Sequence, residues 1–157
     1  MTHSDPRSAA ERKADTLAKL HTRGIDVWVA SASVRGNASA HAHLVPVSLV
    51  WIDERVIIAV ESDSRTARNI TEYGTARLAL GPTRDVVIID AVLDQAVNLE
   101  DAPDALTQRY ADQADWDPRS ARGRYVYVVL RPDRIQAWRE VNELPGRTLM
   151  RAGSWVV

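Results

Sequence analysis

Residues 55–70 read Arg55-Val56-Ile57-Ile58-Ala59-Val60-Glu61-Ser62-Asp63-Ser64-Arg65-Thr66-Ala67-Arg68-Asn69-Ile70. The apolar run predicts a strand, and the polar residues that follow it predict a short turn. Ser64 is a residue type that caps helix N-termini, and Gly74 is one that follows helix C-termini, so a helix is expected over 64–73. The free N–H groups and positive dipole end of such a helix start suit a phosphate.

The expected helix carries two arginines in its first turns. Arg65, Arg68 and Asn69 are three and four residues apart, which predicts one helical face for all three. Ala67 and Ile70 are expected to pack inward from the opposite face. The segment is therefore interpreted as a phosphate-binding helix start on a buried platform. Paired arginines are also typical of a solvated helix face that binds nothing, and this alternative stays open.

Outward from this segment, the hydrophobic pattern predicts more strands than helices. Short turns at 35–37, 53–54 and 132–133 favour antiparallel hairpins, and helices do not alternate regularly with strands as in a doubly wound fold. The prediction is a mainly β (α+β) antiparallel barrel of six or more strands with two to three helices. Residues 1–7 are expected to be a flexible tail and 8–157 a single domain. Helices are expected over 8–23, 64–73 and 101–115, and strands over 25–34, 41–52, 55–60, 75–80, 85–99, 125–131 and 134–139, with a last short strand within 147–157.

Composition narrows the possible functions. The 20 basic and 21 acidic residues nearly cancel, so the chain as a whole is no binder of nucleic acid. The absence of cysteine excludes disulfides, thiol nucleophiles and thiolate metal sites. No segment approaches the roughly 20 apolar residues of a membrane span. Residues 1–23 are polar, which argues against a secretory signal, and the expected compartment is the cytoplasm.

Pro46 is an anomaly inside the expected strand 41–52. Proline cannot donate to a β-ladder, so the strand is expected to be bulged or at a sheet edge at this point. Backbone N–H and C=O groups beside the gap would then be free to meet a flat heterocycle. A proline that only protects an edge strand from aggregation is the alternative.

Histidine and tryptophan residues supply further candidates. His41 and His43 share one strand face, but no third metal ligand accompanies them, so no metal site is predicted. Of the five tryptophans, Trp51 and Trp138 are taken as the more favourable for contact with a ligand.

No catalytic side chain can be assigned. Asp85 and Asp90 are interpreted as turn and barrel-rim residues, because neither has an identifiable partner carboxylate. Ser48, Ser62 and Ser64 lack the nucleophile-elbow motif, which argues against hydrolase chemistry.

Several segments follow one another in a recognisable order and spacing. They are 26–31 (DVWVAS), 43–48 (HLVPVS), 62–70 (SDSRTARNI), 76–80 (ARLAL) and, near the end, 142–151 (NELPGRTLMR) followed by Gly153 and Trp155. Together they resemble the pyridoxamine-phosphate-oxidase-like family of split β-barrel flavoproteins. The resemblance covers about residues 10–155 and depends on the order of the segments rather than on one motif.

The resemblance implies a homodimer that binds FMN, or the deazaflavin coenzyme F-420, in two grooves at the subunit interface. Members of the family often carry lysine near the helix start, where this chain has arginines; the guanidinium fork also suits phosphate. By match to the family, the isoalloxazine would lie along the backbone of Val45, Pro46, Val47 and Ser48, the ribityl chain beside Val60, Glu61 and Ser62, and the phosphate on Arg65, Arg68 and Asn69.

The expected function is hydride transfer by the bound cofactor to or from an unknown small organic substrate. FMN and F-420 both stay open, because both need a phosphate grip. The oligoglutamate tail of F-420 would also favour a longer basic groove. One alternative is a non-catalytic carrier of flavin, F-420 or haem, and another is a protein of this fold that binds no ligand. Candidates for a longer basic groove are Arg35, Arg77, Arg119, Arg122 and Arg124.

Overall fold

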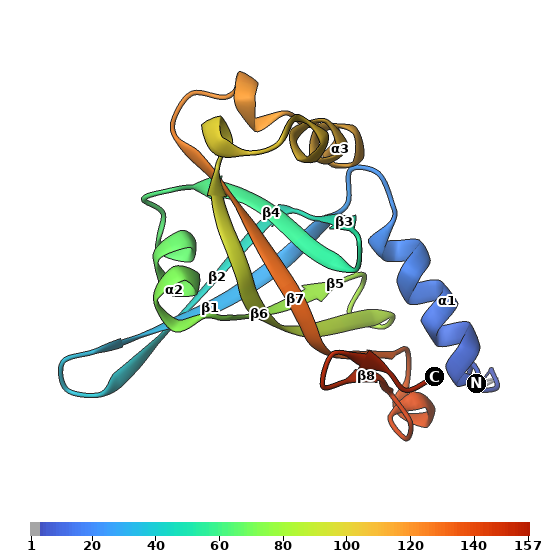
Figure 1. Ribbon diagram of the computed structural model, residues 1–157. Coiled ribbons are helices and arrows are strands. Elements are labelled where there is room, and N and C mark those ends of the chain that lie inside the picture. The colour runs from blue at the N-terminus through green and yellow to red at the C-terminus, as the bar shows by residue number, and fades with distance from the viewer. Residues whose placement is uncertain (1–3) are drawn as a thin grey trace.

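One antiparallel sheet of nine strands forms the body of the protein, and it does not close on itself. A computed structural model describes residues 4–157 (Figure 1). The main strand order is β2-β1-β5-β6-β7-β4-β3, and β8 and β9 extend from β7. The predicted mainly β, split-barrel architecture is therefore confirmed. The elements are α1 (Ala9–Leu20), β1 (Asp26–Arg35), β2 (Ser39–Ser48), β3 (Val50–Ile52), β4 (Arg55–Glu61), α2 (Arg65–Tyr73), β5 (Thr75–Leu80), β6 (Val86–Asn98), η1 (Leu99–Asp101), α3 (Asp104–Ala114), η2 (Pro118–Ser120), β7 (Tyr125–Trp138), η3 (Val141–Glu143), β8 (Thr148–Arg151) and β9 (Ser154–Trp155).

Strand β4 is buried on both faces, which explains its uninterrupted apolar sequence. Val56, Ile58 and Val60 point into the main core inside the curved sheet. Ile57 and Ala59 point the other way, into a second core that Tyr110 and Ala114 of α3 cover. Because successive strand residues face opposite sides, a strand between two cores needs apolar residues at every position. The neighbouring part of β7, from Tyr125 to Leu130, follows the same pattern.

The three helices cover different parts of the sheet. Helix α3 lies over the outer face of β3 and β4, and α1 runs along the side near β8 (Figure 1). Helix α2 lies beside β1 and β2 and buries Ala67 and Ile70 in the main core. The β1–β2 hairpin projects beyond the body next to α2. No helix within residues 4–157 is long and apolar enough to cross a bilayer.

The predicted cap residues of α2 are confirmed. The Ser64 hydroxyl accepts a hydrogen bond from the Ala67 N–H, and Gly74 ends the helix with φ of +74°. Only glycine adopts that left-handed conformation without a steric penalty. The Tyr73 hydroxyl then bonds both the N–H and the C=O of Val34, each at 3.1 Å. The end of α2 is thereby fixed to β1 close to the turn of the projecting hairpin.

No hairpin forms at 132–133, so that prediction is wrong. Residues 125–138 form one strand, β7, in which Ala91 pairs with Pro132 while Asp90 pairs with Arg134. Asp133 is thus an extra residue, a β-bulge that lets proline stay inside a strand. The expected strand 41–52 is likewise two strands, because the chain breaks pairing at the buried Leu49, whose N–H bonds the Ile25 carbonyl.

Other element boundaries differ by a few residues. Helix α1 ends at Leu20 rather than Arg23, and α3 begins at Asp104, with Pro103 as its N-cap rather than in its first turn. The last short strand expected within 147–157 is a small hairpin, β8–β9. The long strand predicted over 85–99 is β6, which is central and irregular in register near Asp90 and Leu93.

A buried ionic cluster joins the start of the described chain to its end. The Arg7 guanidinium donates to both Glu143 carboxylate oxygens at 2.9 and 2.7 Å and to Asp15 at 2.7 Å. The backbone N–H groups of Arg7 and Arg139 also donate to the Glu143 carboxylate. The Arg7 hydrogen bonds hold the pKa of Glu143 at about 2, below its ordinary value of 4.5. Part of the segment expected as a flexible tail therefore makes specific contacts, while residues 1–3 lie outside the described residues.

Replacing Glu143 by glutamine should lower the free energy of unfolding at pH 7 by about 3 kcal/mol. The carboxylate is 3% exposed, and its neutralisation removes the charge that accepts two guanidinium hydrogen bonds from Arg7, which keeps only Asp15 and the more distant Asp85 as partners. A depressed pKa stabilises the fold above pH 4.5 and is lost as pH falls toward 2, so the difference between wild type and E143Q should shrink over that window. Urea unfolding at a series of pH values measures it.

Glu140→Gln is the matched control, because Glu140 pairs with the exposed Arg84 at the surface. That substitution should change stability by less than about 1 kcal/mol at every pH. Equal effects of E143Q and E140Q at pH 7 would contradict a stabilising role for the buried cluster.

Candidate functional site

The two ends of the open sheet face each other across a pocket of about 390 Å³. Strand β2 forms one wall and the end of β4 the other, and the two strands lie near each other without pairing. The start of α2 and the loop before β7 complete the lining. Pockets of this size commonly bind small molecules or cofactors. The lining residues are His43, Val45, Val47, Ser48, Ala59, Val60, Glu61, Ser64, Thr66, Trp116 and Tyr125.

The β4 wall has an unpaired sheet edge. Strand β3 pairs only with residues 55–57 of β4, so 58–61 have β7 on one side and no strand on the other. At this edge the Ala59 N–H donates to the Tyr110 hydroxyl at 3.2 Å. Tyr110 and Tyr127 pack beneath the edge with their ring centroids 5.1 Å apart, and burial raises the pKa of both phenols. The β4 wall is thus fixed from behind by buried aromatic side chains.

The β2 wall presents alternate side chains to the pocket. His43, Val45 and Val47 line it, whereas Leu44 and Pro46 are exposed on the outward face. Pro46 pairs in unbroken register with Trp28 of β1, and β2 has no strand on its other side. The edge position predicted for the proline is therefore confirmed, and there is no bulge there. An edge strand tolerates proline because the missing donor can face away from its neighbour.

The start of α2 forms one end of the pocket. Thr66 is 2% exposed and lines the pocket, and its hydroxyl has no hydrogen-bond partner in residues 4–157. The N–H groups of Arg65 and Thr66 also have no partner within the described chain, as expected for a first helical turn. A hydroxyl and two free N–H groups at a helix N-terminus match an anionic group. Sequence reasoning placed the anion here but did not single out Thr66.

The predicted single face for Arg65, Arg68 and Asn69 is wrong for Asn69. Both arginines are exposed and form no ion pair with any described residue. Asn69 is buried and donates to the Ser31 hydroxyl of β1 at 3.1 Å. Asn69 lies one residue beyond Arg68, about 100° further around the helix, which turns it toward the buried side of Thr66 and Ile70. The two arginines are exposed on the helix whose first residues line the pocket, while Asn69 secures α2 to the sheet.

Of the three residues expected beside a ribityl chain, two line this pocket and the third lines a neighbouring depression. Val60 and Glu61 line the pocket. The Ser62 N–H and hydroxyl both bond the Arg124 carbonyl, at 2.8 and 3.2 Å. Ser62 therefore faces a neighbouring depression of about 410 Å³, which Arg124 and Tyr125 also line.

Two aromatic residues that sequence reasoning did not select form a wall of the pocket. Trp116 and Tyr125 meet edge to face, with ring centroids 5.4 Å apart and planes at 71°. Trp51 is instead buried in the main core, and Trp138 lies under the Arg147 guanidinium. No sequence signal separated Trp116 from the other tryptophans, because its position depends on how the loop after α3 folds back over β4.

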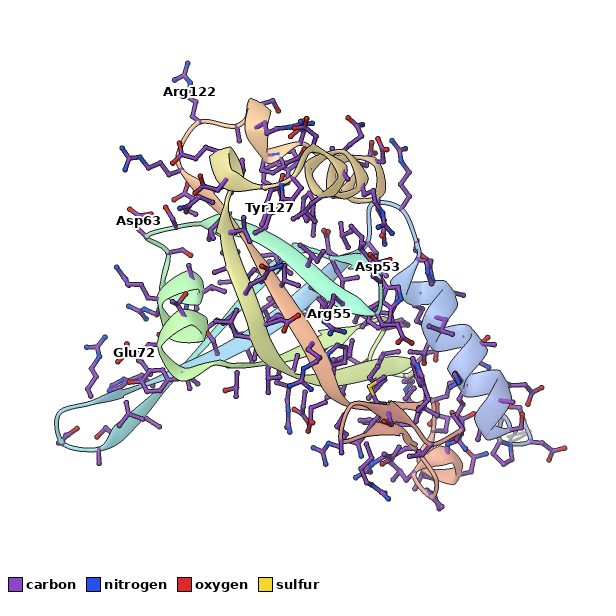
Figure 2. The ribbon with its side chains drawn as sticks, in the orientation of Figure 1. Asp53, Arg55, Asp63, Glu72, Arg122 and Tyr127 are labelled. Atoms are coloured by element: carbon purple, nitrogen blue, oxygen red, sulfur yellow. The ribbon has the colours of Figure 1, made fainter. Side chains whose placement is uncertain are left out.

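Most other candidate charges are engaged elsewhere. Arg77 pairs with Asp90 and Arg119 with Asp117, and Arg122 projects away from the domain (Figure 2). Asp85 pairs with Lys19, consistent with the structural role expected of it. Within residues 4–157 no group of three or more histidine, aspartate or glutamate side chains could hold a metal.

Comparison with solved structures identifies proteins of similar fold. No protein-family model matches the chain, and no curated protein sequence matches it. Among solved structures, an F420 reductase has a TM-score of 0.53 at 17% identity, over 74% of this chain and 92% of that one. A "Putative Pyridoxamine 5'-phosphate oxidase" from Listeria innocua has a TM-score of 0.55 at 13% identity, over 83% and 98%. A heme binding protein from Mycobacterium smegmatis has a TM-score of 0.55 at 20% identity, over 90% and 57%.

At these identities the likeness concerns the fold. The nine-stranded open sheet and three helices agree with it. The chain has the pyridoxamine-phosphate-oxidase-like split β-barrel fold.

Proposed function

We propose that the protein binds a flavin-type cofactor, FMN or F-420, in the pocket between β2 and β4. We further propose that it is an oxidoreductase acting on a small organic substrate. The observation that carries the proposal is the combination of a helix start that has free N–H groups with a largely apolar pocket between two unpaired sheet edges. A phosphate joined to a flat heterocycle requires these two features side by side.

The residues at the helix start fit a phosphate. The Thr66 hydroxyl and the N–H groups of Arg65 and Thr66 lack partners in residues 4–157, so a phosphate oxygen would satisfy donors that the fold leaves free. Arg65 and Arg68 are exposed beside them and can add charge-assisted hydrogen bonds. Asn69 acts indirectly by holding α2 against Ser31.

The edges of the sheet fit a ring system. Val45 and Val47 give the slot an apolar side, and the polar backbone atoms of two unpaired edges supply donors and acceptors. The bound cofactor would supply the hydride chemistry, and the protein would position the ring and adjust its electronics through hydrogen bonds. This division of labour suits a pocket without an evident nucleophile.

Charge favours FMN over F-420. The oligoglutamate tail of F-420 would need a run of free cations leading from the pocket. Arg77 and Arg119 are already paired, Arg122 points away from the domain (Figure 2), and Arg124 lines the depression next to the pocket. Arg35 ends β1 beside the hairpin turn, whereas the pocket-lining part of β2 is at the other end of the hairpin. The F420 reductase among the structural neighbours keeps the deazaflavin as the second choice.

The outward face of the β1–β2 hairpin supports a homodimer. Trp28 and Leu44 are 51% and 59% exposed there, beside Pro46 and a row of alanines. An exposed apolar face of this kind marks a protein interface. Because β2 carries the pocket on its other face, a second copy seated on this hairpin would place both cofactor sites next to the interface.

Two variants test the phosphate site. Replacing Arg65 and Arg68 together by alanine should weaken FMN binding about 10- to 100-fold, because two charge-assisted contacts are lost. The fold should persist, since both side chains are exposed. Riboflavin, which has no phosphate, should bind the double variant as it binds the wild type. Fluorescence titration measures both ligands.

Arg122→Ala is the matched control, because that arginine projects into solvent (Figure 2). Thr66→Val tests the pocket-lining hydroxyl with little change of shape, and it should weaken FMN about tenfold, with recovery in Thr66→Ser. Unchanged FMN affinity in the double arginine variant would refute the proposed phosphate site.

The dimer is tested by placing a charge on the apolar face. Leu44→Glu should yield monomers at micromolar concentrations at which the wild type sediments as a dimer, because a buried unpaired carboxylate opposes association. Val141→Glu is the control, since Val141 is 70% exposed on η3, away from the hairpin. A dimeric L44E protein would exclude this face.

A non-catalytic carrier is the second candidate, and His43 is the observation that favours it. A histidine that lines the pocket could ligate haem iron, and one structural neighbour is a heme binding protein. A carrier of this type should bind hemin with a shifted Soret band that His43→Ala abolishes. His41→Ala, on the exposed part of the same strand face, should leave that band unchanged.

The flavin proposal predicts the opposite result. Hemin should bind wild type and H43A equally weakly, while FMN shows a perturbed absorption band with wild type. Uptake of FMN or F-420 without turnover, across reductants and acceptors, would favour a carrier. Refusal of both cofactors would indicate a protein that uses the fold without a ligand.

A further inference from the structure

We infer that Trp116, supported by Tyr125, is the residue that contacts the ring of the bound ligand and selects for flat fused heterocycles. This inference rests on the proposed function. Trp116 lies in the loop between α3 and β7, and it lines the same pocket as Val45 and Val47 of β2. The pocket therefore joins a planar aromatic surface to branched aliphatic side chains, which suits a thin planar ring.

The β4 wall contributes a small residue to the same pocket. Ala59 is the smallest residue of the apolar run Val56–Val60, and it lines the pocket. Tyr125 pairs with Glu61, the residue that follows Val60 at the end of β4. The Trp116–Tyr125 pair and the small Ala59 thus belong to the same end of the β4 edge, where the strand has no neighbour.

Hydrogen bonds anchor the chain both just before and just after Trp116. Asp115 ends α3 in the left-handed region, with φ of +55°, and the Gln113 carbonyl before it accepts the Gly24 N–H at 2.7 Å. On the other side the Asp117 carboxylate accepts the Arg119 N–H at 2.9 Å and pairs with its guanidinium. Arg119 also donates to the Thr107 hydroxyl of α3. An aromatic ring fixed in this way loses little entropy when it contacts a ligand.

The indole would also affect the light emission of a bound flavin. An excited flavin ring takes an electron from a tryptophan in contact with it, and the electron returns, so both molecules end unchanged and emission is lost. FMN bound to the wild type should therefore be almost non-fluorescent. A merely structural role for Trp116 would not produce this effect.

FMN and riboflavin are the probes that test the assignment. Trp116→Ala should weaken both ligands by the same factor, about 10- to 100-fold, because the ring contact is common to both. Trp116→Phe should lose less affinity. FMN at saturating concentration should recover emission in W116A. Trp138→Phe is the matched control, since Trp138 is half-buried under Arg147 and away from the pocket.

The outcomes separate the inference from the proposed function. W116A that binds both ligands as the wild type does would overturn the role of Trp116 while the flavin site stands. So would FMN emission that stays quenched in W116A but recovers when Tyr125, the other aromatic side chain of the pocket, is replaced by phenylalanine. A wild type that binds neither ligand would overturn both. If W116A loses thermal stability as well as affinity, W116F distinguishes a lost ligand contact from a folding defect. W116F should keep the wild-type unfolding midpoint, and FMN bound to it should still fluoresce more strongly than FMN bound to the wild type.

Discussion

The unpaired edges of β2 and β4 are the constraint on which the rest of the structure depends. A buried backbone group without a hydrogen bond carries a large free-energy penalty, so two sheet edges that face each other must pair, meet water or bind something else. Here the strands lie close without pairing. Tyr110 satisfies one edge N–H of β4, and Pro46 removes one donor from β2. What remains is a slot whose polar atoms are available to a ligand.

Much of the fold follows from local sequence. The apolar run from Val56 to Val60 predicted its strand because residues on both faces are buried. Ser64 and Gly74 delimited α2 because a side-chain cap and a left-handed residue are needed at those positions. Pro46 indicated a sheet edge for the same kind of local reason. These signals depend on a few neighbouring atoms, and so they can be predicted without the tertiary structure.

The failures involve residues whose role depends on distant segments. Pro132 indicated a turn, but pairing with Ala91 of β6 keeps it within β7 by means of a bulge at Asp133. Helical spacing predicted that Asn69 shares a face with the two arginines. The spacing carries no information about the Ser31 hydroxyl of β1, to which Asn69 donates a hydrogen bond in the fold. Trp116 was missed because the loop that carries it meets β4 only after α3 has packed. For the site, the helix start and the β2 strand were predictable, and the aromatic wall was not.

The two walls of the slot differ in rigidity. Strand β4 is clamped between two cores, so the amides that it pairs with β7 should exchange with solvent only when the whole domain opens. Strand β2 is bonded to β1 alone, and its hairpin reaches beyond the body (Figure 1). The β1–β2 hairpin is therefore the wall that can move to admit or release an occupant. Residence time of an occupant would then be governed by the hairpin rather than by the barrel.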